Sequence, residues 1–277
     1  PVICLPGPPR ELVPIFDDEL VPRITEVREA RGEKVERIAR RIYRVFGRGE
    51  SQIAAMLEGL CEGSPGASLH FQVKFPETLV KVVVRSGDAA RAEAILGDID
   101  AQVRERLGPL VYGVGDAALP VVVGQRLRDA GMSLATAESC TGGLIGSLLT
   151  EVPGSSEYYL GGAVTYANEE KQRQVGVKRE TLEKFGAVSE ECVSEMARGI
   201  REGSGADIGV AVSGIAGPSG GTAEKPVGTV WLAVSGPGDH HSTRHICWPS
   251  SRAQIRKMSS FAALSLVLRA IGKGDES

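Results

Sequence analysis

Three apolar segments of this 277-residue chain each end in a polar or glycine-rich turn, and this repetition limits the folds open to it. The turns lie in Thr136–Gly143 (TAESCTGG), Val164–Lys171 (VTYANEEK) and Val212–Gly221 (VSGIAGPSGG). After the first turn, the apolar residues of Leu144–Leu149 have the spacing of a helix packed on a sheet. Strands that alternate with helices predict an α/β fold, in which ligands gather at the carboxyl ends of the strands.

The first turn, where an expected strand ends and an expected helix starts, places Ser139 at the N-terminus of that helix. At a helix N-terminus, free N–H groups and the positive end of the dipole can hold an anion. Gly142 and Gly143 have no Cβ and would let a ligand approach the backbone closely. Ser and Thr before an apolar run are also ordinary N-caps, so the local pattern alone leaves a plain capped helix equally open.

The second turn predicts a helix that begins at Asn168 as N-cap, with Lys171 at its third position. The helix dipole opposes an ammonium ion there, and burial would favour the neutral amine, whereas Glu169 and Glu170 would favour the charged form. A neutral amine beside a serine hydroxyl is the Ser–Lys form of an activated nucleophile. An exposed lysine without a chemical role is the alternative.

The third turn is a loop dense in glycine, from which backbone amides can face a phosphate or an oxyanion. It is neither a Walker A loop nor a dinucleotide-binding fingerprint, so the pattern by itself is weak. A plain hairpin or an Ω-loop explains it as well.

These segments, with GAVSEE, the continuation TAEKPVGTVW and the closing helix, resemble the C-terminal domain of the competence/damage-inducible protein CinA family from about Leu119 onward. Family members hydrolyse the carboxamide of nicotinamide mononucleotide and release ammonia. The resemblance implies Ser139 as nucleophile and Lys171 as its base, with Tyr166 and Thr141 orienting the pair. Backbone N–H groups near Cys140 to Gly143 would stabilise the oxyanion, and no metal or organic cofactor would be needed.

The same resemblance implies a substrate site for a small nucleotide, in which the glycine loop holds phosphate or ribose. Arg252 could pair with the phosphate, although an exposed arginine is as good an explanation. The expected substrate-binding residues are Thr141, Gly142, Gly143, Ser213, Gly214, Gly217, Gly220, Gly221 and Arg252.

Residues 1–31 resemble the tail of the molybdopterin-binding-like domain that precedes the deamidase in this family. Val2–Leu5 is expected to form a buried strand, Pro6–Pro9 a rigid turn, and the residues from about Arg10 a helix. The family associates that domain with ADP-ribose hydrolysis, but one strand cannot build a nucleotide site, so we do not expect that activity here. Pro1 in place of Met fits a fragment of a longer protein.

Residues 32–115 form an expected small α+β unit that resembles the middle KH-like domain of the family. The segment 35–46 has helical spacing, yet the resemblance makes it a strand. The remaining expected elements are a helix over 51–61 capped by Ser51, strands over 69–73 and 79–84, a helix over 88–107 and an edge strand at 111–112. A nucleic-acid role would rest on fold analogy alone, so we expect a spacer or dimerisation module and a homodimer.

Residues 116–277 are expected to form a three-layer α/β/α sandwich with a mixed sheet. Its predicted helices cover 120–130, 189–203 and 251–271, and a hairpin joins strands over 229–234 and 242–247. Ser189, followed by Glu190 and Glu191, suits the start of the second of these helices.

The amino-acid composition limits which binding partners and which cellular compartment the chain is suited to. A net charge of −3 argues against a nucleic-acid footprint, and no apolar run is long enough to span a membrane. Five scattered cysteines without a C-x-x-C pair fit a reducing cytoplasm and no structural zinc. Cys140 is an intrinsically better nucleophile than serine, but next to Ser139 it would point elsewhere. The three histidines His240, His241 and His245 fit a solvated hairpin end better than a metal site.

The family resemblance, with the cysteine content, therefore implies a cytoplasmic nicotinamide-mononucleotide amidohydrolase. The alternative is a binding protein rather than an enzyme. It would recognise a nucleotide without turning it over and act as an accessory in competence or the DNA-damage response. A metal-dependent ADP-ribose pyrophosphatase would need the complete N-terminal domain.

Overall fold

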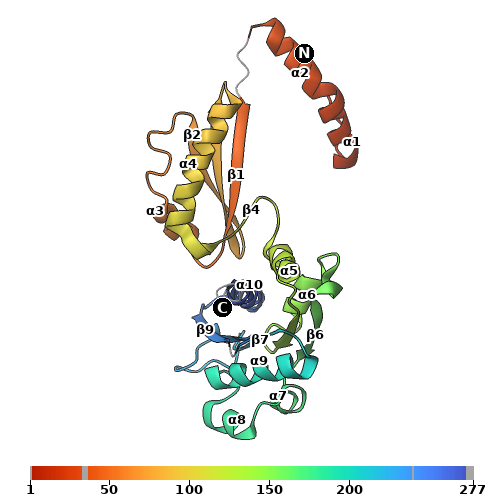
Figure 1. The fold of residues 1–277 in the computed structure, drawn as a ribbon, viewed down its shortest axis with the longest axis vertical. Helices are drawn as coiled ribbons and strands as arrows, with labels where there is room; N and C mark the ends of the chain where they lie inside the picture. Colours follow the sequence, from red (N-terminus) through yellow and green to blue (C-terminus); the bar gives the residue numbers. More distant parts are fainter. Residues whose placement is uncertain (1, 33–36, 239, 273–277) are drawn as a thin grey trace. The chain divides into compact units, whose positions relative to one another are not determined.

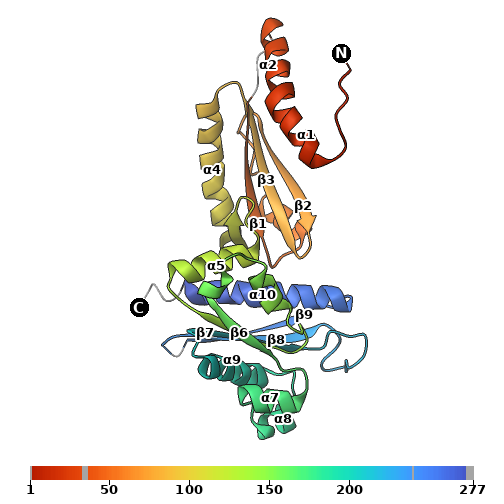
Figure 2. The ribbon, with the colours of Figure 1, turned by 90° about the vertical axis from the view of Figure 1, so that its right-hand side faces the viewer.

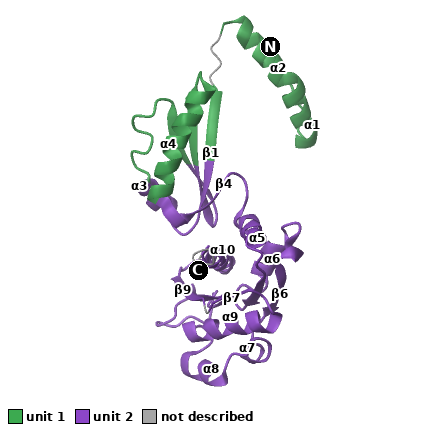
Figure 3. Ribbon diagram, viewed as in Figure 1, with its two compact units in different colours: residues 1–41, 57–70, 81–106 green, residues 42–56, 71–80, 107–277 purple. Residues whose placement is uncertain are grey.

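The computed structural model describes residues 2–32, 37–238 and 240–272, which fall into two compact units (Figure 3). One unit comprises residues up to 41, 57–70 and 81–106. The other comprises residues 42–56, 71–80 and those from 107 onward, and it contains the candidate site.

The first unit begins with helical segments: α1 (Pro9–Ile15), a π-helical turn (Phe16–Leu20) and α2 (Val21–Ala30). The expected helix near Arg10 is confirmed, but the buried strand over Val2–Leu5 is wrong, since these residues have no regular structure and Val2 is 92% exposed. A strand needs a partner for its backbone groups, and no strand among the described residues pairs with this segment. Helix α4 (Ala89–Leu107) corresponds to the predicted helix over 88–107, and its Ile99 and Val103 are fully buried.

A four-stranded sheet in the order β2-β3-β1-β4 contains residues of both units. Its strands are β1 (Arg37–Val45), β2 (Ala67–Lys74), β3 (Glu77–Ser86) and β4 (Val111–Val114). The segment with helical spacing is thus the strand that the family resemblance implies, because β-sheet pairing outweighs a short periodic pattern. A 3-10 turn (Gly108–Leu110) precedes β4, which pairs antiparallel with β1.

The helix after β1 is shorter than predicted. Helix α3 spans Glu50–Met56, so Ser51 lies inside it rather than at its cap. Leu57 and Leu60 are buried as the apolar pattern requires, but they lie in turns that follow the helix. Gly59 has a φ of 72°, which is left-handed backbone that ends helical geometry.

The second sheet has the order β6-β5-β7-β8-β9, with β5 parallel to β6 and β7, and β8 and β9 antiparallel to their neighbours. The predicted mixed sheet and hairpin are therefore confirmed. Its strands are β5 (Leu134–Glu138), β6 (Tyr159–Val164), β7 (Ile208–Gly214), β8 (Thr229–Ser235) and β9 (His241–Cys247). The helical elements around it are α5 (Leu119–Asp129), α6 (Leu144–Thr150), a 3-10 turn (Ser155–Glu157), α7 (Asn168–Val175), α8 (Arg179–Phe185), α9 (Glu190–Ser204) and α10 (Arg252–Ile271).

Helices cover both faces of this sheet, with α10 on one side and α9 on the other (Figures 1 and 2). Successive strand residues point to opposite faces, so Val210 and Val212 join the core under α5, α6 and α10, whereas Ala211 joins the core under α7 and α9. The three-layer α/β/α sandwich is thus confirmed. No helix of the described chain combines the length and hydropathy that a bilayer crossing requires.

The register of the central strands aligns their carboxyl ends. Glu138, the last residue of β5, is paired with Val164 of β6 on one side and with Val212 of β7 on the other. All three predicted turns therefore begin at the same edge of one sheet, as the sequence pattern requires.

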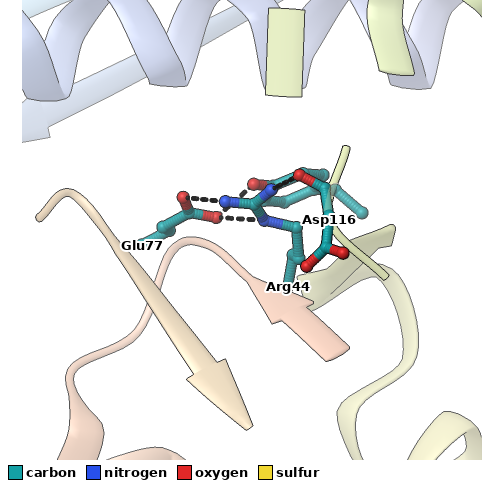
Figure 4. A network of polar contacts seen from close by, with 4 residues as sticks. Arg44, Glu77 and Asp116 are labelled. Carbon is teal, nitrogen blue, oxygen red and sulfur yellow. Dashed lines mark hydrogen bonds and ion pairs between the residues drawn. The ribbon is translucent and has the colours of Figure 1, made fainter. Parts of the chain in front are cut away.

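A buried ion pair lies in the second unit (Figure 4). Arg44 donates to both carboxylate oxygens of Glu77, with N–O distances of 3.0 and 2.7 Å, and both side chains are only 4% exposed. A third N–H of Arg44 donates to the backbone carbonyl of Asp116, and the hydroxyl of Tyr112 donates to Glu77. The network joins β1, β3, β4 and the segment after β4.

Arg44→Met is expected to lower the free energy of unfolding by about 3–5 kcal/mol, because it leaves the buried Glu77 carboxylate without its counter-ion. The double variant Arg44→Met/Glu77→Met removes both charges and should be less destabilised than the single one. Urea denaturation of the two variants gives the comparison. A double variant as unstable as Arg44→Met would show that packing, rather than the unpaired charge, sets the loss.

Candidate active site

Ser139 and Lys171, 32 positions apart in sequence, are in direct contact. Lys171 Nζ lies 3.1 Å from Ser139 Oγ, and the two residues are 1% and 7% exposed. Ser139 directly follows β5 and Lys171 lies on α7, which follows β6. The parallel pairing of β5 and β6 therefore brings the two side chains together.

Lys171 is buried, and burial shifts its amine toward the neutral form that can accept a proton from Ser139. Its Nζ also donates to the backbone carbonyls of Thr165, at 2.8 Å, and Tyr166, at 3.3 Å. In its neutral form, an amine that donates both N–H bonds to these carbonyls would direct its lone pair at the Ser139 hydroxyl. Burial lowers the pKa of Lys171, and the weaker effects of Cys192, Cys140 and Glu169 in the opposite direction do not reverse this.

Ser139 does not lie at the N-terminus of a helix, contrary to the prediction. Helix α6 begins at Leu144, and its free N–H groups at Ile145 and Gly146 donate to the carboxylate of Glu138, at 3.0 and 2.9 Å. The anion at this helix start is thus a side chain of the protein. Glu138 is 1% exposed, so these two N–H groups are not available to a ligand.

The turn between Ser139 and α6 leaves two other amides free. Gly142 and Gly143 have φ values of 59° and 90°, a conformation that glycine adopts without strain. The N–H of Gly142 donates to the carbonyl of Ser139, whereas the N–H groups of Cys140 and Thr141 donate to no oxygen of the described residues. Amides directly after a nucleophile are suited to stabilise an oxyanion.

Arg256 of α10 forms hydrogen bonds with the backbone of this turn. Its Nε and one terminal nitrogen both donate to the carbonyl of Thr141, at 3.2 and 2.7 Å. The hydroxyl of Thr141 itself is buried and has no hydrogen-bond partner in the described chain. Thr141 is therefore held by Arg256 through its backbone carbonyl, and its side chain makes no hydrogen bond with Ser139 or Lys171 in the described chain.

A cavity of about 340 Å³ opens beside Ser139 and Lys171. Of the predicted residues, it is lined by Ser139, Lys171, Tyr166, Ser213, Gly214, Gly217, Gly220 and Arg252. Thr141, Gly142, Gly143 and Gly221 are not among its lining residues. The volume lies near the lower end of the range typical of small-ligand sites.

The far wall of the cavity is the glycine loop after β7. Gly217 and Gly220 have φ values of 75° and 89°, and the N–H groups of 216, 217, 219 and 220 have no partner among the described residues. Arg252 donates to the carbonyl of Gly217 and to the hydroxyl of Tyr166, both at 2.8 Å. Free amides beside a guanidinium form a surface suited to a phosphate.

Tyr166 and Ser213 contact the cavity in different ways. Tyr166 is 59% exposed, and its hydrogen bond with Lys171 uses the backbone carbonyl. Ser213 is buried, and its hydroxyl donates to the carbonyl of Ala187 at 2.7 Å. Ser213 thus ties the glycine loop to the segment before α9.

Cys140, the alternative nucleophile, and the histidines near the hairpin end lie in different surroundings. Burial raises the pKa of the Cys140 thiol to about 12, which keeps it protonated and a poor nucleophile near neutral pH. His241 contacts the hydroxyl of Ser194, and the ring of His245 packs on Trp231. No cluster of three or more metal-ligating side chains occurs among the described residues.

Two further residues emerge only from the structure. Neither Glu138 nor Arg256 is among the site residues expected from the sequence. Glu138 binds amides seven and eight positions ahead, which is not the spacing of a capping box, and Arg256 reaches a turn 115 positions away. No local sequence signal marks either contact.

Comparisons with known proteins agree with this architecture. A family model described as the CinA C-terminal domain matches residues 116–271, and one described as the damage-inducible protein CinA KH domain matches residues 40–113. A CinA-like protein of Kosmotoga olearia is 38% identical over 98% of this chain and 64% of its own length. A putative competence-damage inducible protein of Clostridium acetobutylicum is 40% identical, again over 98% and 64%. The chain thus spans slightly less than two thirds of these relatives.

Solved structures are similar to part of the chain. The competence/damage inducible protein CihA of Agrobacterium tumefaciens matches with a TM-score of 0.54 and 42% identity, over 56% of this chain and 93% of that one. A CinA superfamily protein of Klebsiella pneumoniae matches with a TM-score of 0.54 and 35% identity, over 56% and 96%. From the matching family model and these relatives, the chain belongs to the CinA family.

Proposed function

We propose that this protein hydrolyses the carboxamide of nicotinamide mononucleotide to nicotinate mononucleotide and ammonia. The observation that carries the proposal is the 3.1 Å contact between the buried Lys171 amine and the Ser139 hydroxyl beside a cavity. A serine with a lysine as general base is an established arrangement for acyl transfer. The free amides and Arg252 on the opposite wall suit the phosphate of a nucleotide.

In the first half of the reaction, Ser139 Oγ attacks the carboxamide carbon while Lys171 Nζ takes the hydroxyl proton. The resulting oxyanion would be stabilised by the N–H groups of Cys140 and Thr141. The lysine then returns its proton to the amide nitrogen, the carbon–nitrogen bond breaks, and ammonia leaves an acyl-serine.

In the second half, a water molecule gives a proton to Lys171 and attacks the acyl carbon. The carbon–oxygen bond to Ser139 breaks, and the proton on Lys171 returns to Oγ. The two carbonyl groups that bind Nζ keep the amine in place through both steps. Ser213, Gly214, Gly217 and Gly220, which line the cavity, would shape the ribose-phosphate side.

We also propose a homodimer in the reducing cytoplasm, with the KH-like part as spacer or dimerisation module. The five cysteines are all free thiols, which suits that compartment. The rival function, a nucleotide-binding accessory protein without catalysis, would use the same cavity but release no product.

Ammonia release from nicotinamide mononucleotide by the purified chain separates these two functions. We expect turnover, and we expect EDTA to leave it unchanged because every proposed step uses side chains and backbone amides. Binding of the nucleotide without ammonia release would support the accessory protein. Activity that EDTA abolishes and a divalent ion restores would contradict the metal-free mechanism.

A further inference from the structure

A second and larger cavity, of about 660 Å³, lies within the unit that contains the sheet of β5 to β9. Its walls come from the segment after β1, the turn between β2 and β3, strand β9 and helix α10. The lining residues that matter here are Phe46, Arg48, Phe75, Arg244, Trp248 and Met258. None of these lines the cavity beside Ser139.

Two arginines in this cavity have no counter-ion among the described residues. Arg244 of β9 is half-buried, and neither it nor Arg48 makes an ion pair or side-chain hydrogen bond within the described ranges. Burial lowers the pKa of Arg244, and the nearby Arg269 and Arg48 lower it further. A desolvated cation surrounded by other cations is unfavourable unless an anion is bound there for part of the time.

The carboxylates that line the cavity do not neutralise these arginines. Glu77 is committed to Arg44 and Tyr112 through both of its oxygens. Glu50 is exposed, and no ion pair joins it to an arginine in the described part of the chain. The cavity therefore has an excess of positive charge.

One wall of the cavity is a flat aromatic surface. The rings of Phe75 and Trp248 are stacked, with centroids 5.5 Å apart and planes inclined by 20°. This pair is too close to admit a third ring between its members, so a flat ligand would pack against an outer face. Aromatic faces of this kind bind nucleobases by stacking.

We propose that this cavity is a second ligand site and that it binds a nucleoside monophosphate, with the phosphate on Arg244 and Arg48 and the base on the aromatic wall. A guanidinium binds a phosphate through two parallel hydrogen bonds, which explains the use of arginine. The volume fits a ligand of this size. The site is independent of the proposed amide hydrolysis.

The fluorescence of Trp248 provides a local readout. The chain has two tryptophans, so Trp231→Phe leaves Trp248 as the only one. In this background we expect AMP to change the fluorescence saturably. Adenosine has no anion and ribose 5-phosphate has no flat ring, so each should bind at least about 10-fold more weakly than AMP.

Arg244→Gln should raise the Kd for AMP at least about 10-fold without changing ammonia release from nicotinamide mononucleotide. Arg252→Gln is the matched control, because it removes one guanidinium from the other cavity and should leave the Trp248 signal intact. If circular dichroism shows that Arg244→Gln is misfolded, the exposed Arg48→Gln replaces it.

Three results would overturn the site. The first is the absence of a saturable Trp248 response to AMP. The second is an unchanged Kd in folded Arg244→Gln, or in Arg48→Gln where it replaces that variant. The third is a signal that disappears with Arg252→Gln and persists with Arg244→Gln, which would place AMP beside Ser139.

Discussion

Replacement of Ser139 by alanine is expected to lower the rate of ammonia release by at least about 10⁴-fold, because it removes the proposed nucleophile. The Oγ atom is the one serine oxygen in hydrogen-bond contact with Lys171. Alanine keeps the turn, since the Ser139 backbone N–H and carbonyl bind Val212 and Gly142 independently of the side chain. Turnover under saturating nicotinamide mononucleotide, with calorimetry of nucleotide binding, measures the two effects separately.

The matched control is Cys140→Ala, which removes the neighbouring nucleophilic atom. Its thiol is buried and its raised pKa keeps it protonated, so this variant should retain most of the activity. The Ser139→Ala protein should still bind the nucleotide, because the glycine loop and Arg252 are untouched. Wild-type turnover in Ser139→Ala, or loss of activity in Cys140→Ala alone, would reverse the assignment of the nucleophile.

Lys171→Arg is expected to be as inactive as Lys171→Met, with a loss of similar size to that of Ser139→Ala. A guanidinium stays protonated in proteins and cannot accept the serine proton. Methionine has a comparable length and no charge, and it serves as the control for a fixed-charge role. Single-turnover rates of ammonia release on variants shown to be folded measure the loss.

The pH dependence of turnover tests the protonation state of Lys171. Burial lowers the pKa of this amine below the 10.5 of a free lysine, so the neutral base predominates at lower pH than it would in water. Below the folded-state pKa the amine is protonated and cannot act as a base. Turnover should therefore rise with pH through one ionisation that lies below 10.5, and fall as pH decreases through it.

Substantial activity in Lys171→Arg would show that residue 171 acts only as a positive charge. The base would then have to be sought in Tyr166, Glu138 or a water molecule. Tyr166 is a poor candidate by geometry, since its hydroxyl is bound to Arg252 rather than to Ser139. Glu138 is occupied by two amides of α6.

Local patterns were sufficient to predict most of the elements around the site. The apolar runs that end at Glu138, Val164 and Val212 are strands, and Ser189 caps α9 as expected, accepting from the N–H of Cys192. Helix α7 begins one residue earlier than predicted, with Ala167 as N-cap and Lys171 at the fourth position. These features depend on neighbours within a few positions, and sequence patterns describe such neighbours well.

The sequence by itself determined which residues occur at the three strand ends, including Ser139, Lys171 and the glycine loop. Only the tertiary structure decided how they meet, because the register of β5 against β6 and β7 is a long-range pairing that no local pattern contains. In the folded structure α6 starts at Leu144, later than the sequence suggests, and its free amides donate to Glu138. A buried carboxylate requires hydrogen-bond donors, and these amides lie within its reach only in the folded sheet.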